Sequence, residues 1–240
     1  MRYLVELSYD GSNFNGFQRL NDERSVQAEL EHALSIINKA DVEVKGAGRT
    51  DKGVHALGQR AHFDLDVDVP IDRLKTALND ILPGDIRIIS IEKVTQDFHA
   101  RFNVTKKVYE YKINTGEYDV FKNNYYYQYK YDFNIDILKE VASLFIGVHN
   151  FKNFVSGERD NYEAIIYNID INKDNDIITI TFEGKSFYRY MVRNLVGAML
   201  DVARGKATID DVKNMLDNYD IDKHLSCAPA NGLYLNKIYY

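Results

Sequence analysis

The N-terminal residues alternate between apolar and polar side chains. In residues 2–9 every odd position is Tyr, Val or Leu and most even positions are polar, a period of two that predicts a half-buried strand. Residues 10–12, Asp-Gly-Ser, are typical of a turn. Apolar residues then recur at helical spacing over 26–37, and Ser25 stands before them as a suitable N-cap. The chain therefore opens with a strand, a turn and an amphipathic helix.

Two more strands, a second helix and a final strand complete the first half. Val-Glu-Val-Lys at 42–45 alternates, and so do residues 57–65, which predicts two strands. Pro70 opens a helix with one apolar face, and Pro83-Gly84 closes it. Residues 86–95 have the pattern of a strand. The order of elements is β-α-β-β-α-β, which is typical of a ferredoxin-like unit.

The second half of the chain repeats this order without a visible repeat of its sequence. The Tyr-rich stretch 125–131 suits an edge strand, although its rings could also stack on bases. The patterns predict these elements in turn: a strand at 104–114, a helix at 136–148, strands at 164–172 and 177–183, helices at 187–204 and 209–216, and a strand at 232–239.

Taken together, these patterns predict an α+β fold made of two ferredoxin-like halves. We divide the chain into residues 1–100 and 101–240, with a linker near 95–101. We expect the antiparallel sheets of the halves to join into one mixed sheet with helices on one side, and an active-site cleft to lie between the halves.

Composition and charge narrow the class of protein. Of the 240 residues, 45% are hydrophobic and 28% are charged, which is ordinary for a soluble globular protein. The net charge of −6 argues against a protein that coats nucleic acid indiscriminately, because such binding requires many cations. A single cysteine, Cys227, cannot form an intramolecular disulfide. No apolar run suggests a secretory signal or a membrane span, so we expect a cytoplasmic protein without a membrane partner.

The stretch GAGRTDKGVHALGQ, residues 46–59, combines glycines with reactive side chains between two predicted strands. Glycine lacks a Cβ, so a ligand could approach the main chain closely there. Asp51 would be ionised at neutral pH, and Arg49 would project to the same side in extended backbone. A guanidinium held close favours the ionised carboxylate, as a nucleophile or base requires. The alternative is that residues 50–53 form only a type I turn, where Asp and Gly are favoured for local reasons.

This stretch closely resembles the signature of the tRNA pseudouridine synthase A family, in which the aspartate of the G-R-T-D segment is catalytic. Further matches to the family run through almost the whole chain: YDGSNFNGFQ at 9–18, RSVQ at 24–27, ALNDILPGDI at 77–86, FHARFNVTKKVYEY at 98–111, MVRNLVGAML at 191–200 and APANGLYL at 228–235.

The resemblance implies an enzyme and its substrate. It implies an isomerase that converts uridine to pseudouridine at positions 38, 39 and 40 of the tRNA anticodon stem-loop, with Asp51 as the catalytic nucleophile. It also implies a homodimer whose two cradles each accept one tRNA. The first half would carry the catalytic loop, and the second half would contribute substrate and RNA contacts. Whether Asp51 attacks C1′ or C6, or takes a sugar proton, stays open.

Three residues of the second half match substrate-contacting positions of the family. Tyr109, in KKVYEY, resembles the family's substrate-contacting tyrosine. Arg193, in MVRN, resembles an active-site arginine that could pair with Asp51 or with a phosphate. Leu233, in GLYL, resembles a residue that forms a wall of the uridine pocket. From the residues alone, Tyr109 would be a sheet residue, Arg193 would be solvated, and Leu233 would be part of the core. Tyr111 is interpreted as a half-buried sheet residue, without a role in substrate binding.

Arg49 is expected to contact substrate too, and its truncation to harm activity and stability if it forms a desolvated pair with Asp51. Other contacts with RNA are expected from basic residues inside the matched motifs, Arg101, Lys106 and Lys107. His55 could also touch RNA, but it more readily orients the loop through a hydrogen bond.

No cofactor is implied by the sequence. Six histidines and one cysteine show no metal-ligand spacing, and GAGRTD lacks the spacing and the terminal Lys-Ser/Thr of a nucleotide-binding loop. Pseudouridine formation itself requires neither an energy source nor a redox group.

One departure from the family concerns the second half. Where the family carries an arginine before a middle strand, this chain has Ile-Tyr-Asn at 166–168, and Arg159 lies upstream. The set of modified positions could therefore be narrower. Two other functions stay open from the residues: an RNA-binding protein or chaperone without catalysis, and a small-molecule phosphate or sugar enzyme.

Overall fold

The computed structural model describes residues 1–20, 23–218 and 224–240, and they form two compact units. Unit 1 consists of Met1–Thr105 together with Tyr234–Tyr240, and unit 2 consists of Lys106–Leu233. The predicted division at residue 100 differs from these units, because the last seven residues belong with the first half of the chain. The reason is strand pairing: Tyr234 and Leu235 lie opposite His55 and Ala56 in a parallel ladder.

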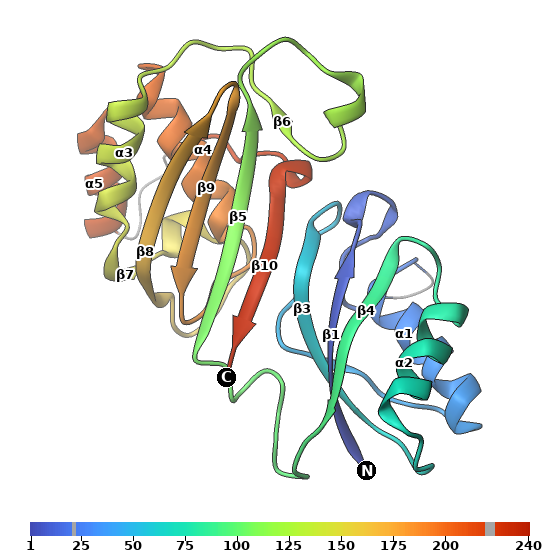
Figure 1. Ribbon diagram of the computed structural model, residues 1–240. Helices are drawn as coiled ribbons and strands as arrows, with labels where there is room; N and C mark the ends of the chain where they lie inside the picture. Colours follow the sequence, from blue (N-terminus) through green and yellow to red (C-terminus); the bar gives the residue numbers. More distant parts are fainter. Residues whose placement is uncertain (21–22, 219–223) are drawn as a thin grey trace. The chain divides into compact units, whose positions relative to one another are not determined.

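Unit 1 has the predicted β-α-β-β-α-β order. Strands β4, β1 and β3 are antiparallel neighbours in that sequence, β2 is antiparallel to β3, and β10 is parallel to β3 (Figure 1). This is the strand arrangement of a ferredoxin-like unit, extended by one strand. The elements are β1 (Arg2–Tyr9), η1 (Gly11–Asn13), α1 (Val26–Asn38), β2 (Lys45–Gly46), β3 (His55–Asp64), α2 (Ile71–Ile81), β4 (Ile86–Lys93) and β10 (Leu233–Tyr239).

The predicted helix start and the predicted first strand are confirmed. Ser25 caps α1, since its hydroxyl accepts a hydrogen bond from the Ala28 amide at 3.3 Å. The odd-numbered residues of β1 are buried, as the period of two requires. Helices α1 and α2 contact each other, and α2 lies against β4. Their buried apolar faces and that of β1 form the core of unit 1: Tyr3, Val5, Leu7, Tyr9, Val26, Leu30, Ala33, Leu34, Leu74 and Leu78.

The strand predicted over 42–45 is shorter and lies later than expected. Only Lys45 and Gly46 pair with β3. Val42 and Val44 are buried, but their amides donate to side chains of α1, to Ser35 Oγ at 3.2 Å and to Glu31 Oε1 at 3.1 Å. The alternation of apolar and polar residues over 42–45 therefore reflects burial against α1. The amides of Val42 and Val44, which would pair with a neighbouring strand, donate to side chains of this helix instead.

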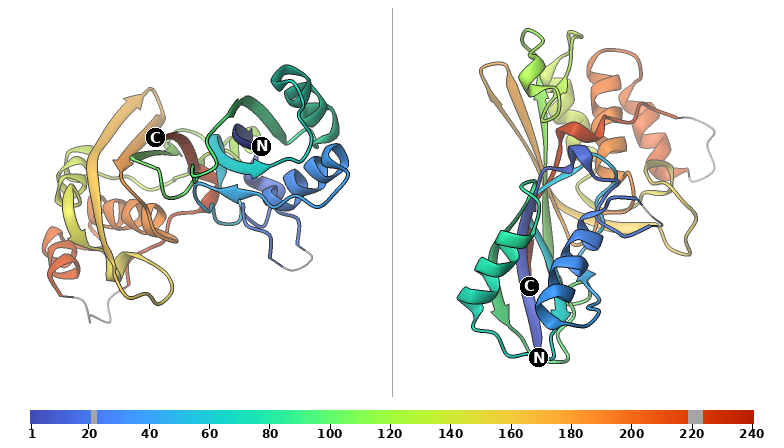
Figure 2. Two further views of the ribbon diagram at one scale, coloured as in Figure 1. Left: turned by 90° about the horizontal axis from the view of Figure 1, so that it is seen from below. Right: turned by 90° about the vertical axis from the view of Figure 1, so that its right-hand side faces the viewer.

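Unit 2 is also an α+β unit. Strands β5, β9, β8 and β7 form an antiparallel sheet in that order, and β6 pairs in parallel with the end of β5. Helices α3, α4 and α5 gather beside these strands (Figure 2). The elements are β5 (Lys106–Asn114), η2 (Val120–Lys122), β6 (Tyr127–Gln128), α3 (Ile135–Leu144), β7 (Gly147–Asn150), η3 (Lys152–Phe154), β8 (Glu163–Asp174), β9 (Ile177–Gly184), α4 (Met191–Ala203), α5 (Ile209–Asp217) and η4 (Ala230–Gly232).

Two predicted helices of unit 2 have different bounds because of single backbone conformations. The helix predicted over 136–148 ends at Leu144, and Gly147, with φ +111°, begins strand β7. The helix predicted from residue 187 begins at Met191, because Tyr190 has φ +61°. Left-handed backbone interrupts a right-handed helix. The α+β class of the fold is confirmed.

The Tyr-rich stretch forms only a two-residue strand. Tyr127 and Gln128 pair with the end of β5, and the rings of Tyr127, Tyr129 and Tyr131 meet edge to face at 5.3 and 5.5 Å between centroids. Aromatic packing rather than a long ladder therefore accounts for the run of tyrosines. In the described part of the chain, no helix has the length and apolar composition that a membrane span requires.

Candidate active site

Asp51 lies in unit 1, in the loop that joins β2 to β3. Its side chain is half-buried, between buried Thr50 and exposed Lys52. The Val54 amide donates to the Asp51 carbonyl at 3.1 Å, which closes the turn before β3. The predicted type I turn over 50–53 is wrong in position and type: the turn spans residues 51–54, and its third residue, Gly53, has φ +80°, which type I does not allow. The turn presents the Asp51 carboxylate just before β3.

The segment that follows β1 holds this loop by its backbone. The Phe17 amide donates to the Thr50 carbonyl at 3.2 Å, and the Gly53 amide donates to the Phe14 carbonyl at 3.3 Å. These two bonds lie on either side of Asp51 in the chain. The matched motif at 9–18 thus acts as a clamp that fixes the backbone on which the carboxylate stands.

Glycines make this clamp possible. A Cβ at Gly16, where φ is +95°, would lie 2.5 Å from the Thr50 carbonyl oxygen, and a Cβ at Gly11 would lie 2.0 Å from the Val54 carbonyl oxygen. Within the loop, a Cβ at Gly46 would lie 2.3 Å from the Phe17 ring. We expected the glycines of residues 46–59 to admit a ligand, but at Gly46 the space is filled by the Phe17 ring.

Buried side chains complete the support of the loop. The Tyr9 hydroxyl and Thr50 Oγ1 are 2.8 Å apart, and Gln59 Nε2 donates to the Gly48 carbonyl at 3.1 Å. Burial raises the pKa of Tyr9 to about 12, so this hydroxyl stays protonated at neutral pH. Sequence reasoning did not single out Tyr9, Gly16 or Gln59. The motif at 9–18 was the available signal.

His55 has the loop-orienting position that we considered more natural for it. The ring is 2% exposed, and Nδ1 accepts a hydrogen bond from the Gly11 amide at 3.0 Å. Nδ1 also lies 3.2 Å from Asp10 Oδ1. The ring also stacks on Tyr234 at 4.7 Å. Because His55 is buried, its side chain positions the loop and does not offer a surface to RNA.

Arg49 does not form the desolvated pair that we expected. Its side chain is exposed, and the structure gives no ion pair between Arg49 and Asp51 among the described residues. The projection argument fails because the loop is not extended strand at this point. The Arg49 guanidinium is therefore accessible from solvent.

The exposure of Arg49 leads to a prediction. Arg49→Ala should leave the free energy of unfolding within about 0.5 kcal/mol of wild type, because its exposed side chain has no hydrogen bond or ion pair among the described residues. Urea unfolding of both proteins checks this expectation. A loss of about 3 kcal/mol would instead indicate a buried ion pair.

Unit 2 places Tyr109 and Arg193 on β5 and α4. Tyr109 is 6% exposed, and its ring meets Phe187 edge to face at 5.2 Å. Arg193 is half-buried, with Nε donating to the Ala228 carbonyl at 2.8 Å and its guanidinium 4.7 Å from the centre of the Tyr190 ring. These contacts fix the plane of the guanidinium. Tyr190 holds Arg193 and was missed by sequence reasoning, since a positive φ at a tyrosine leaves no signal in the sequence.

The segment before β10 is held by the same two elements. The Ala228 amide donates to the Arg193 carbonyl at 3.0 Å, and the Tyr111 hydroxyl donates to the Pro229 carbonyl at 2.7 Å. A Cβ at Gly232 would lie 2.7 Å from the Lys112 carbonyl oxygen. Leu233 follows and is 5% exposed. Its position therefore depends on β5 and α4 as well as on its own strand.

Tyr111 has a structural role, and the hydroxyl is essential to it. Tyr111→Phe should destabilise the protein by about 1–3 kcal/mol, because the Pro229 carbonyl loses its donor. Tyr129→Phe is the matched control. Its hydroxyl is also buried but has no hydrogen-bond partner in the described residues, so removing it should cost nothing. Equal urea midpoints for the two variants would contradict the role of the Tyr111 bond.

The remaining basic candidates lie in different environments. Lys106 Nζ forms an ion pair with Glu183 at 3.0 Å, and Lys107 is 8% exposed, so both face protein groups in this structure. Arg101 is exposed, in the loop after β4. Tyr167 belongs to the stretch 166–168, where an arginine was expected from the resemblance. It lies on β8 and is 43% exposed. Of these residues, only Arg101 presents an accessible cation.

Chemically, the loop offers a carboxylate whose backbone is held in place by hydrogen bonds. Among the described residues, no group of three or more His, Cys, Asp or Glu side chains could hold a metal ion. Asp51 and Arg49 belong to unit 1, and Tyr109, Arg193 and Leu233 belong to unit 2.

Comparison with known proteins gives consistent results. A family model described as tRNA pseudouridine synthase matches residues 7–103 and 141–240. The chain is 42% identical to tRNA pseudouridine synthase A of Thermosipho melanesiensis, 39% identical to that of Bacillus subtilis and 40% identical to that of Listeria monocytogenes. Each alignment covers 100% of this chain and 99% of the relative.

Proposed function

This chain belongs to the tRNA pseudouridine synthase family, and we propose that it modifies uridines 38, 39 and 40 of the anticodon stem-loop with Asp51 as the catalytic nucleophile. Family membership makes the protein an isomerase that acts on tRNA. The target positions and the roles of individual residues are supported by the resemblance of the motifs around them.

The observation that carries the role of Asp51 is the construction of its loop. Backbone bonds from Phe14 and Phe17 hold the residues on both sides of it, and the buried Tyr9 hydroxyl meets Thr50. A reacting group must be held close to its productive geometry by a rigid surround. Asp51 is the only carboxylate in the motif at residues 46–59, so no other acidic side chain of that motif can take this role.

The chemistry requires a carboxylate and little else. The N1–C1′ bond of uridine breaks, the base turns, a C5–C1′ bond forms, the hydrogen of C5 leaves as a proton, and N1 gains a proton. A carboxylate can stabilise positive charge at the sugar, attack carbon or take a proton. All three routes start from an ionised carboxylate, so they share the same dependence on Asp51.

The uridine must leave its stack before it reacts, which costs a few kcal/mol. We assign Tyr109 and Leu233 to contact the base and sugar, and Arg193 to bind a negatively charged group of the substrate. Arg193 suits this role because its Nε is already bonded to Ala228 and Tyr190 supports its plane. We further expect a cytoplasmic homodimer.

Tritium release tests the function. Unmodified tRNA carrying tritium at uracil C5 is incubated with the protein, and release of tritium to water reports the formation of the new C–C bond. Replacing uridines 38, 39 and 40 by cytidine, one at a time and together, identifies the targets. Tritium release from tRNA with all three positions replaced would contradict the proposed target positions. No tritium release from any of a full set of tRNAs would contradict the proposed catalytic activity.

A further inference from the structure

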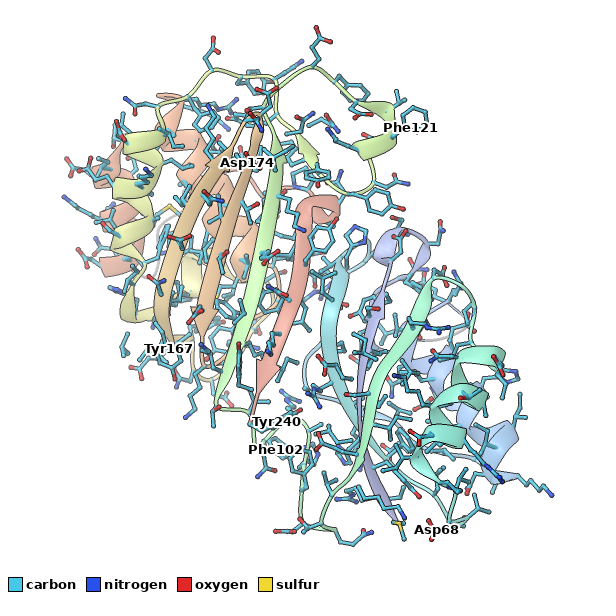
Figure 3. The ribbon with its side chains drawn as sticks, in the orientation of Figure 1. Asp68, Phe102, Phe121, Tyr167, Asp174 and Tyr240 are labelled. Atoms are coloured by element: carbon cyan, nitrogen blue, oxygen red, sulfur yellow. The ribbon has the colours of Figure 1, made fainter. Side chains whose placement is uncertain are left out.

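Phe102 is an exposed aromatic ring in the loop between β4 and β5. It is 76% exposed and is labelled in Figure 3 at the end of unit 1, as is Tyr240. A single exposed apolar side chain is ordinary in itself. Three features of this loop distinguish it: a fixed backbone, a supporting ring and nearby cations.

The backbone around Phe102 is fixed by contacts with β3 and with Tyr240, the residue after β10. The Ala100 amide donates to His62 Nδ1 at 3.1 Å, and the Tyr240 hydroxyl donates to the Ala100 carbonyl at 2.9 Å. On the other side of the turn, the His99 amide donates to Asn103 Oδ1 at 2.8 Å. The loop therefore presents the ring in one place, which lowers the entropy lost when a partner binds.

One side of the Phe102 ring is supported by histidines. Its centroid lies 4.2 Å from that of His99 at an interplanar angle of 32°, and His99 lies 4.7 Å from buried His62. Burial, followed by the charge of His99, lowers the pKa of His62 to about 4. The pKa of His99 is also lowered, mainly by burial. Neutral rings thus support Phe102, and its exposed surface is available to another flat group.

Cations gather at the same place. The Arg101 guanidinium is 5.9 Å from the centre of the Phe102 ring, and the structure gives Arg101 no ion pair among the described residues. After burial, the charges of Lys45, Arg2 and Arg101 are the next causes of the lowered His99 pKa. Arg2 is neutralised by Asp64 at 2.7 Å, and Lys45 lies 3.3 Å from exposed Glu43. Arg101 is therefore the cation best placed to meet an anionic partner.

We propose that Phe102 and Arg101 form an RNA contact, in which an unpaired base of the tRNA stacks on the Phe102 ring and a neighbouring phosphate binds Arg101. The proposal rests on the proposed function, because it takes the substrate to be tRNA. Stacking on an exposed aromatic ring beside a cation is how proteins hold unpaired nucleotides. A second copy of this chain fits less well, since a two-fold symmetric contact would bring the Arg101 residues together.

Binding measurements test the contact, using Asp51→Asn protein so that the tRNA is not converted. Phe102→Ala should raise the Kd for unmodified tRNA about tenfold, and Phe102→Tyr should restore it. Phe121→Ala is the matched control, because Phe121 is 87% exposed but lies in η2, where Lys122 is paired with Asp119. It should bind as the parent does. Arg101→Ala should reduce the slope of log Kd against log salt by about 0.7–0.9, the share of one phosphate.

Several results would overturn the contact. One is a Kd of Phe102→Ala for tRNA equal to that of Phe121→Ala. Another is a change in the molecular mass of Phe102→Ala, measured by sedimentation, without a change in its affinity for tRNA. That result would assign the ring to a contact between copies of the chain. Tritium release by otherwise wild-type protein separates the two proposals. If release is normal and Phe102→Ala binds normally, only this contact is wrong. If release is absent while binding depends on Phe102, the contact stands and the proposed function is wrong.

Discussion

In the Asp51→Asn variant, tritium release from uracil C5 is expected to fall by about 10⁴-fold or more, while tRNA binding and the free energy of unfolding stay close to those of wild type. The amide has the size of the carboxylate but lacks its charge and nucleophilicity, so each of the three possible roles of Asp51 is lost. Single-turnover release with excess protein measures the loss directly, and filter binding with the same tRNA measures retention of affinity.

A control variant separates chemistry from net charge. Asp80→Asn removes the same charge from the exposed side of α2 in the same unit, and it should release tritium at the wild-type rate. If Asp51→Asn kept a tenth or more of the wild-type rate, Asp51 could not be the nucleophile, and the assignment of the loop as catalytic would be lost.

Gly16→Ala is expected to lower the rate of tritium release about 100-fold although residue 16 is not expected to touch the substrate. A methyl group at this position would lie 2.5 Å from the Thr50 carbonyl oxygen and 3.3 Å from the Asp51 carbonyl carbon. These are backbone atoms, so the loop that carries Asp51 must itself move. A displacement of about 1 Å at a reacting group can cost about 100-fold in rate.

The matched control is Gly157→Ala. Gly157 has φ +89°, close to the +95° of Gly16, but a Cβ there meets nothing within 4 Å. Left-handed backbone alone should cost this variant about 1–2 kcal/mol of stability, with a normal rate at a temperature where it is folded. A Gly16→Ala protein with the same stability loss and a normal rate would show that the clamp does not position Asp51.

Several features of the fold and of the candidate site could be predicted from the sequence, because they depend on residues that are close together in the chain. The strand at β1, the Ser25 cap of α1 and the start of α2 at Pro70 follow from local periodicity and capping. The loop containing Asp51 was found because its glycines and charged residues are contiguous. Its match to a family then supplied the reaction, which composition and spacing do not contain.

Other features depend on residues that are distant in the chain. Val42 and Val44 alternate like a strand, yet helix α1 takes their amides. Arg49 is two residues from Asp51, yet it turns to solvent. Gly11 and Gly16 look like ordinary turn residues, and only the fold shows that the loop containing Asp51 crosses them at a distance that excludes a side chain.

The sequence by itself determined β1, α1 and α2, the α+β class, the carboxylate and the family, because periodicity, caps and contiguous motifs are properties of short segments. The tertiary structure decided that the last strand joins the first unit, that His55 and Tyr111 hold loops, and that Phe102 stands exposed beside Arg101. Those outcomes depend on which distant backbone and side-chain groups satisfy each hydrogen bond and fill each space, and adjacent residues carry no record of that choice.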